Sequence, residues 1–220
     1  MTEFDRFALD RDAPEDQRVA LFPPFLDIGA DPPSKPAREG PLRLLSVAMM
    51  REGAKLNSYL GLAKALPHLE IDWALDIVGD GPARGAVEAA FEVFGERVRF
   101  LGAVSDETAL RPIYESADLF VWPGVDEAFG MVYLEAQAAG TPVIAEDHPG
   151  PRAVIAPSSG PSNGPSSGLV PPDDPHAFAA AIEALAGKPG ASEDVRTYIK
   201  LHHGQDAAAE RLRRELEALL

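Results

Sequence analysis

Two glutamates, Glu127 and Glu135, have a spacing in this chain that is suited to ligand binding. Glu127 follows the apolar run 119–122, which predicts a strand buried on both faces. Glu135 lies in a segment of helical periodicity, about 7 Å beyond Gly130 along the helix axis. Carboxylates accept hydrogen bonds from hydroxyl groups, and helix N-termini attract anions. The stretch therefore predicts a site for a ligand that is anionic at one end and rich in hydroxyls.

The elements around these glutamates form a strand–loop–helix–strand unit. Pro123 and Gly124 end the first strand, and Gly140 and Pro142 follow the helix. The apolar residues 143–145 predict the next buried strand. On spacing alone, the alternative is a βαβ unit with two solvated glutamates, because surface glutamate is common.

From Pro41 onward, apolar runs alternate with helical patterns. Strands are expected at 42–49, 73–78, 98–102, 119–122, 143–145 and 169–170. Ser105 is expected to cap the helix before the fourth strand, and Asp174 and Pro175 have the residue types of a helix start. This alternation predicts an α/β fold with a Rossmann-like parallel sheet and helices on both faces.

Three regions are expected along the chain. Residues 1–40 are rich in proline and predict a linker or N-terminal extension, and 41–190 form the domain. Within the domain, the Ser/Gly/Pro-rich run 157–168 predicts a long loop. Residues 191–220 are expected to be a C-terminal helical extension. Its apolar stripe either packs on the sheet or marks a self-association surface; it comprises Leu212, Leu216, Leu219 and Leu220.

Composition limits the classes of function. The 220 residues include no cysteine, which excludes disulfides and cysteine-based metal sites. The formal net charge of −15 argues against nucleic acid and anionic lipid as partners. With no long apolar run and an acidic start, we expect no transmembrane segment, no signal peptide and a cytoplasmic protein.

Other motifs carry less chemistry. The turn 79–82 closes a strand as in dinucleotide-binding proteins, but Arg84 stands where the third glycine of that fingerprint belongs, which disfavours a nicotinamide cofactor. His202 and His203 are adjacent and would not face each other on a helix, so no metal site is expected. No nucleophile–base pair stands out.

The central stretch resembles the E-x7-E motif of retaining glycosyltransferase family 4. The matching residues stand in one register: Pro123, Glu127, Phe129, Gly130, Glu135, Ala136, Ala138, Gly140 and 142–145. Residues 78–82 and Arg84 are similar to a second motif of that family, V-G-D-G-P-x-R. The resemblance covers roughly residues 41–187.

This resemblance implies the C-terminal, donor-binding half of a GT-B fold. The family transfers a hexosyl unit from a nucleoside-diphosphate sugar to a hydroxyl acceptor with retention of configuration, as a rule without a bound metal or other cofactor. Its acceptor site lies on an N-terminal domain, which we expect this chain to lack. We therefore expect the chain to bind a UDP-, GDP- or ADP-hexose and to be an incomplete enzyme alone.

Two cations are expected to hold the diphosphate and assist catalysis. The family usually has a V-G pair, then an arginine, then a lysine several residues later, and Lys55 fits that lysine. Here Ala48 replaces the glycine and Met49 stands at the arginine position. Arg51 lies two residues beyond, on the same side of an extended chain, and is the expected replacement.

The remaining contacts are implied by the resemblance. Glu127 is expected to bind hydroxyls of the donor sugar, and Glu135 those of the ribose. Backbone groups around Val104 would meet the base. Backbone amides would approach the sugar and the diphosphate; they belong to Phe129, Gly130 and Met131.

Two other functions stay open. One is a nucleotide-sugar epimerase, since such enzymes share the GT-B fold, although the sequence around Glu127 favours transfer. The other is a non-catalytic module that binds a nucleotide sugar and works with a separate N-terminal domain. The base, the sugar, the acceptor and the oligomeric state are not determined by these patterns.

Overall fold

The computed structural model describes residues 19–32, 40–157, 167–188 and 191–218, with isolated positions 6, 7, 9, 11 and 14 before them. Most of the expected loop at 157–168 lies outside the described residues, as does much of the expected extension at 1–40. The division of the chain at 40 and 190 stays a prediction.

Six parallel strands form the sheet, in the order β3-β2-β1-β4-β5-β6. They are β1 (Leu42–Val47), β2 (Trp73–Val78), β3 (Val98–Gly102), β4 (Leu119–Val121), β5 (Val143–Glu146) and β6 (Gly168–Val170). Their sequences are almost continuously apolar because both faces of a parallel sheet are covered. The expected fold class, a Rossmann-like α/β sheet, is confirmed.

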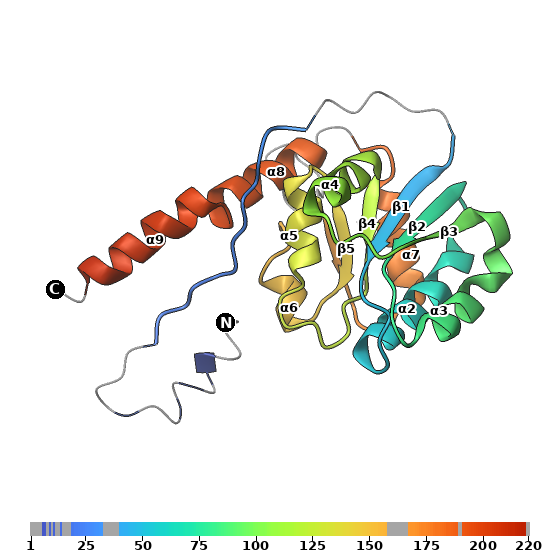
Figure 1. Cartoon of the computed structure of the whole chain (residues 1–220), viewed down its shortest axis with the longest axis horizontal. Coiled ribbons are helices and arrows are strands. Elements are labelled where there is room, and N and C mark those ends of the chain that lie inside the picture. Colours follow the sequence, from blue (N-terminus) through green and yellow to red (C-terminus); the bar gives the residue numbers. More distant parts are fainter. Residues whose placement is uncertain are drawn as a thin grey trace.

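Helices cover both faces of the sheet (Figure 1). On one face, α2 (Ala54–Ala65) contacts α3 (Arg84–Phe91) and α7 (Pro175–Leu185). On the other, α5 (Met131–Ala138) contacts α4 (Glu107–Ser116) and α8 (Ala191–His202). Short helices complete the connections: η1 (Leu66–His68), η2 (Glu92–Arg97) and α6 (Pro149–Arg152).

Aromatic side chains join the helices to the sheet. The ring of Tyr59 in α2 lies edge-to-face on Trp122 at the end of β4, with centroids 4.8 Å apart. Trp73 at the start of β2 meets Phe94 at 5.5 Å. Trp122 is fully buried, and its indole N–H has no hydrogen-bond partner within the described residues. These contacts tie the start of β2 and the end of β4 into the core.

Two helix caps were predicted from the sequence, and one of the two predictions is correct. Asp174 accepts a hydrogen bond from the Ala177 amide at 2.9 Å, as its residue type predicts. The cap of α4 is Asp106 and not Ser105. The Asp106 carboxylate accepts from both the amide and the hydroxyl of Thr108, at 2.9 and 2.7 Å. The charged acceptor next to the serine therefore takes the capping position.

Residues 19–32 run beside α8 (Figure 1). Leu26 pairs with Gly204 as an isolated parallel bridge. Arg196 of α8 is 6% exposed and donates to Asp31, to the Ala30 carbonyl and to a carbonyl at the end of α5. Lys200 and Arg196 lower the pKa of Asp31 to about 2. This segment is therefore fastened to the domain.

The last helix, α9 (Gln205–Glu217), extends away from the sheet (Figure 1). None of its residues is buried, and Leu212 and Leu216 are about half exposed. The alternative in which this stripe packs on the sheet is therefore wrong for 205–217. None of the helices in the described part of the chain has the length and apolar character that a membrane span requires.

Candidate functional site

A pocket of about 310 Å³ opens at the carboxyl ends of β1 and β4. Connections leave these neighbouring strands in opposite directions along the sheet, which is where α/β folds commonly bind ligands. The lining residues come from both halves of the sheet: Val47, Ala48, Met49, Lys55, Val78, Gly79, Asp80, Ala103, Val104, Leu110, Glu127, Gly130, Met131, Val132 and Glu135.

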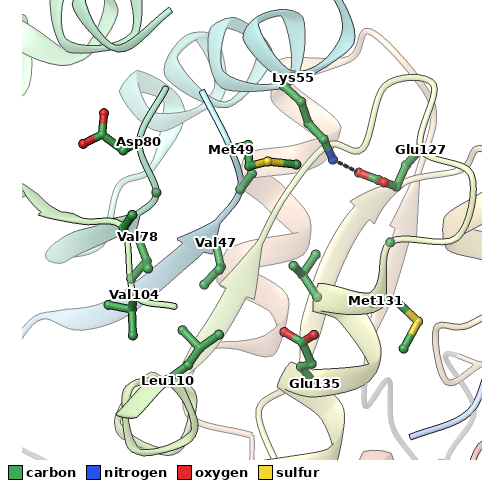
Figure 2. Close-up of a pocket in the computed structure, with 15 residues that line it drawn as sticks. Val47, Met49, Lys55, Val78, Asp80, Val104, Leu110, Glu127, Met131 and Glu135 are labelled. Carbon is green, nitrogen blue, oxygen red and sulfur yellow. Dashed lines mark hydrogen bonds and ion pairs between the residues drawn. The ribbon is translucent and has the colours of Figure 1, made fainter. Parts of the chain in front are cut away.

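A group of apolar side chains and an ion pair lie in different parts of the pocket. Figure 2 shows Val47, Val78, Val104 and Leu110 gathered around one part. The Lys55 ammonium and the Glu127 carboxylate lie at another. An apolar surface beside a few polar groups is typical of a small-molecule site.

Lys55 and Glu127 form an ion pair across the pocket, joining the start of α2 to the loop after β4. Their side chains are 26% and 16% exposed, so water screens the pair only in part. The Lys55 ammonium also lies 5.7 Å from the centroid of the Trp122 ring. Both charged groups are thus held at the pocket surface before any ligand binds.

The loop that carries Glu127 is held by its neighbours. The Val125 amide donates to the Ser58 hydroxyl in α2 at 3.0 Å. Gly130 begins α5 with φ +69°, and a Cβ there would lie 2.5 Å from the Tyr133 ring. Only glycine fits this left-handed and crowded position. The backbone between Glu127 and α5 is therefore closely packed at Gly130.

Glu135 faces the pocket from α5 (Figure 2). Its Oε2 accepts a hydrogen bond from the Tyr114 hydroxyl at 2.8 Å. Burial, together with the charge of Glu135, raises the pKa of Tyr114 well above its ordinary value. The phenol of Tyr114 therefore keeps its proton and can donate it to the hydrogen bond with Glu135.

The turn after β2 forms the opposite side of the pocket. Gly79 has φ +146°, and a Cβ there would lie 1.9 Å from the Ala48 carbonyl oxygen. The hydrogen bond from the Gly81 amide holds the pKa of Asp80 below its usual value, and Arg84 contributes a smaller effect in the same direction. The turn thus lets two chain segments approach closely and places Asp80 in the pocket lining, with its carboxylate directed away from Met49 (Figure 2).

The charges of the lining side chains are unequal. Asp80, Glu127 and Glu135 are acidic, whereas Lys55 is the basic residue among those that line the pocket. Met49 is 50% exposed at the pocket surface. In the described part of the chain, no three His, Cys, Asp or Glu residues lie together as a metal site would need.

Most of the predicted site residues meet at this pocket. Six of them line it: Lys55, Val104, Glu127, Gly130, Met131 and Glu135. Arg51 is exposed and Phe129 packs partly buried against the core, and neither is among the lining residues. The assignment of roles to all eight stays a prediction.

Sequence reasoning missed three contributors to the site. Asp80 lay in a recognised motif and could have been named from it. Leu110 and Tyr114 fit apolar positions of the helix that was expected before the fourth strand, and nothing else marked them. No local pattern distinguishes a core tyrosine from one whose hydroxyl reaches a pocket carboxylate.

A family model described as "Glycosyl transferases group 1" matches residues 42–188. This range covers more than half of the chain. The chain belongs to this glycosyltransferase family. The sequence-based resemblance to glycosyltransferases is therefore confirmed at this level.

Two curated relatives are similar to parts of this chain. A D-inositol 3-phosphate glycosyltransferase of Corynebacterium urealyticum is 31% identical over 190 residues, covering 76% of this chain and 43% of the relative. A GDP-mannose-dependent alpha-(1-6)-phosphatidylinositol dimannoside mannosyltransferase of Mycobacterium tuberculosis is 30% identical over 125 residues, covering 57% and 30%.

A solved structure supports the fold of this chain. Sucrose-phosphate synthase from Thermosynechococcus elongatus superposes with a TM-score of 0.78 at 25% identity, covering all of this chain and 58% of that one. The chain thus spans less than half the length of the curated relatives described above.

Proposed function

We propose that this chain is the donor-binding domain of a retaining glycosyltransferase that uses a nucleoside-diphosphate sugar. The observation that carries the proposal is the pocket at the β1/β4 ends, where Lys55, Glu127 and Glu135 converge from two halves of the sheet. The mycobacterial relative is GDP-mannose-dependent, which supports a nucleotide-sugar donor.

The chemistry of the lining residues matches the parts of such a donor. The Lys55 ammonium would stabilise the charge that develops on the diphosphate leaving group. The α5 N-terminus at Gly130 and Met131 presents backbone amides to an anion. Glu127 would accept hydrogen bonds from the sugar and Glu135 from the ribose, because a carboxylate offers two acceptor oxygens to a diol.

The apolar part of the pocket would hold the base. Val78, Val104 and Leu110 line it, together with the Gly79 backbone. Apolar side chains can pack against any nucleobase, so base choice would depend on backbone groups near Val104. UDP-, GDP- and ADP-sugars are therefore all to be tested.

Binding of the donor is expected to occur without efficient transfer. The acceptor site implied for the family lies on another domain, so we expect these 220 residues to be an incomplete enzyme. Transfer of the hexose to an added hydroxyl acceptor by this chain alone would contradict that expectation.

Calorimetric titration with UDP-, GDP- and ADP-hexoses tests the proposal. One donor should bind saturably. Lys55→Ala and Glu127→Ala should each raise its Kd by about tenfold or more, because each removes a charge-assisted contact with the donor. Lys64→Ala is the matched control, because Lys64 lies exposed on the same helix α2 and outside the pocket.

Thermal unfolding of each variant separates loss of binding from loss of fold. No binding by folded wild-type protein would refute the proposal. So would an equal effect of Lys64→Ala and Lys55→Ala on the Kd.

A further inference from the structure

Tyr114 links α4 to the pocket carboxylate from inside the core. Its side chain is 2% exposed and its hydroxyl donates to Glu135 Oε2 at 2.8 Å. Tyr114 does not line the pocket, whereas Glu135 does. The tyrosine can therefore affect a ligand only through the glutamate.

We infer that Tyr114 is a positioning residue that holds Glu135 for the ribose diol and so sets a preference for ribose over 2′-deoxyribose. The inference rests on the proposed function, because it names the ligand feature that Glu135 would select. It adds a determinant of specificity to the same pocket.

Tyr114 is itself held at three points. Its ring packs against Phe120 in β4, with centroids 5.8 Å apart. Its carbonyl accepts from the Thr141 hydroxyl at 2.7 Å. The Thr141 bond fixes the backbone of Tyr114, and the Phe120 contact and the Glu135 bond restrict its phenol. A donor held in this way restricts the glutamate rotamer before the ligand arrives, which lowers the ordering cost of binding.

The hydrogen bond also leaves Glu135 able to bind a diol. An ionised carboxylate has about four lone-pair sites, so one donor does not exhaust its acceptor capacity. A ribose presents two vicinal hydroxyls, and a 2′-deoxyribose presents one. A carboxylate fixed to receive both would lose one acceptor contact with the deoxy ligand.

The variant that tests this is Tyr114→Phe, which keeps the ring and removes the hydroxyl. Kd values would be measured for the ribonucleoside diphosphate that binds best among UDP, GDP and ADP, and for its 2′-deoxy counterpart. We expect the ratio of deoxy to ribo Kd to fall by about threefold or more. This change corresponds to part of the free energy of one charge-assisted hydrogen bond. The Kd of the deoxy ligand should change less.

Tyr133→Phe is the matched control. Tyr133 is also fully buried and its hydroxyl donates to the Trp122 carbonyl at 3.1 Å, not to Glu135. Tyr133→Phe should leave the ratio of deoxy to ribo Kd unchanged. Glu135→Gln should lower the ratio, since it weakens the acceptor itself.

The outcomes separate the inference from the function beneath it. A ratio that falls with Glu135→Gln and not with Tyr114→Phe overturns the role of Tyr114 alone, as does a wild type without ribose preference. Wild-type protein that binds neither ligand overturns the proposed function and the inference with it. If Tyr114→Phe does not fold, a wild-type crystal structure with the ribonucleotide decides, because loss of the Tyr114–Glu135 bond on binding would overturn the inference.

Discussion

Met49 offers a direct test of how charge controls this pocket. The lining residues include three acids and one lysine, and Met49 lies half exposed in the same pocket. An arginine at this position would not bury its charge, because residue 49 is half exposed to water. We expect Met49→Arg to tighten binding of a nucleoside-diphosphate sugar.

The size of the effect follows from Coulomb's law. A unit charge about 6 Å from a phosphate charge contributes about 0.7 kcal/mol at a dielectric constant of about 80 and about 2.8 kcal/mol at about 20. Since about 1.4 kcal/mol is a tenfold change, the Kd should fall by about 3- to 100-fold. Added salt should reduce the gain, because the position is open to solvent.

Calorimetric titration at low and high salt provides the measurement, with Met49→Gln as the control that keeps a similar length without charge. Equal Kd values for Met49→Arg and Met49→Gln would refute the reasoning. A gain that does not depend on salt would show that packing, not charge, is responsible.

Three further predictions concern stability, measured by urea unfolding. Gly79→Ala should lower the free energy of unfolding by about 3 kcal/mol, because the new Cβ would meet a backbone oxygen and the backbone conformation at Gly79 is strained for alanine. Gly85→Ala is the control, because Gly85 lies in open space on α3, and it should raise the free energy of unfolding by up to about 1 kcal/mol. Similar values for the two variants would contradict this prediction. Arg196→Ala should lower the free energy of unfolding by about 2 to 3 kcal/mol, because the Ala138 carbonyl at the end of α5 would lose its Arg196 donor. Lys200→Ala should lower it much less, because Lys200 binds the same Asp31 but is exposed. Equal losses would argue against a role of burial. Burial lowers the pKa of His203 from 6.5, so stability should decline as pH falls from 6.5 through the lower folded value, and His203→Gln should flatten this decline; an unchanged pH profile in the variant would disprove the assignment.

The sheet could be predicted closely from the sequence, for a physical reason. Strands covered on both faces are continuous apolar runs, so β2 and β3 lie where the runs 73–78 and 98–102 place them. Capping was harder to predict, because Ser105 and Asp106 are neighbouring residues of equal capping type. The choice between them depends on which side chain reaches Thr108.

The site was predictable where motif and topology agree. Lys55, Glu127 and Glu135 meet because the carboxyl ends of neighbouring parallel strands share one edge. The argument for Arg51 assumed that the extended chain continues through 49–51, whereas β1 ends at Val47 and Arg51 does not line the pocket. The direction of a side chain beyond the end of a strand depends on backbone dihedral angles, which a residue spacing does not contain.

The strand order has a consequence for how the protein folds. The site forms where β1 meets β4, and the Ser46–Val121 hydrogen bond across that pair joins residues 75 positions apart. Parallel pairing always spans a long intervening segment, and proteins dominated by such contacts fold more slowly than helical bundles. Lys55 and Glu127 lie on opposite sides of this junction. The ligand pocket therefore cannot exist in a half-folded chain, and ligand affinity appears only when the most distant of these contacts has closed.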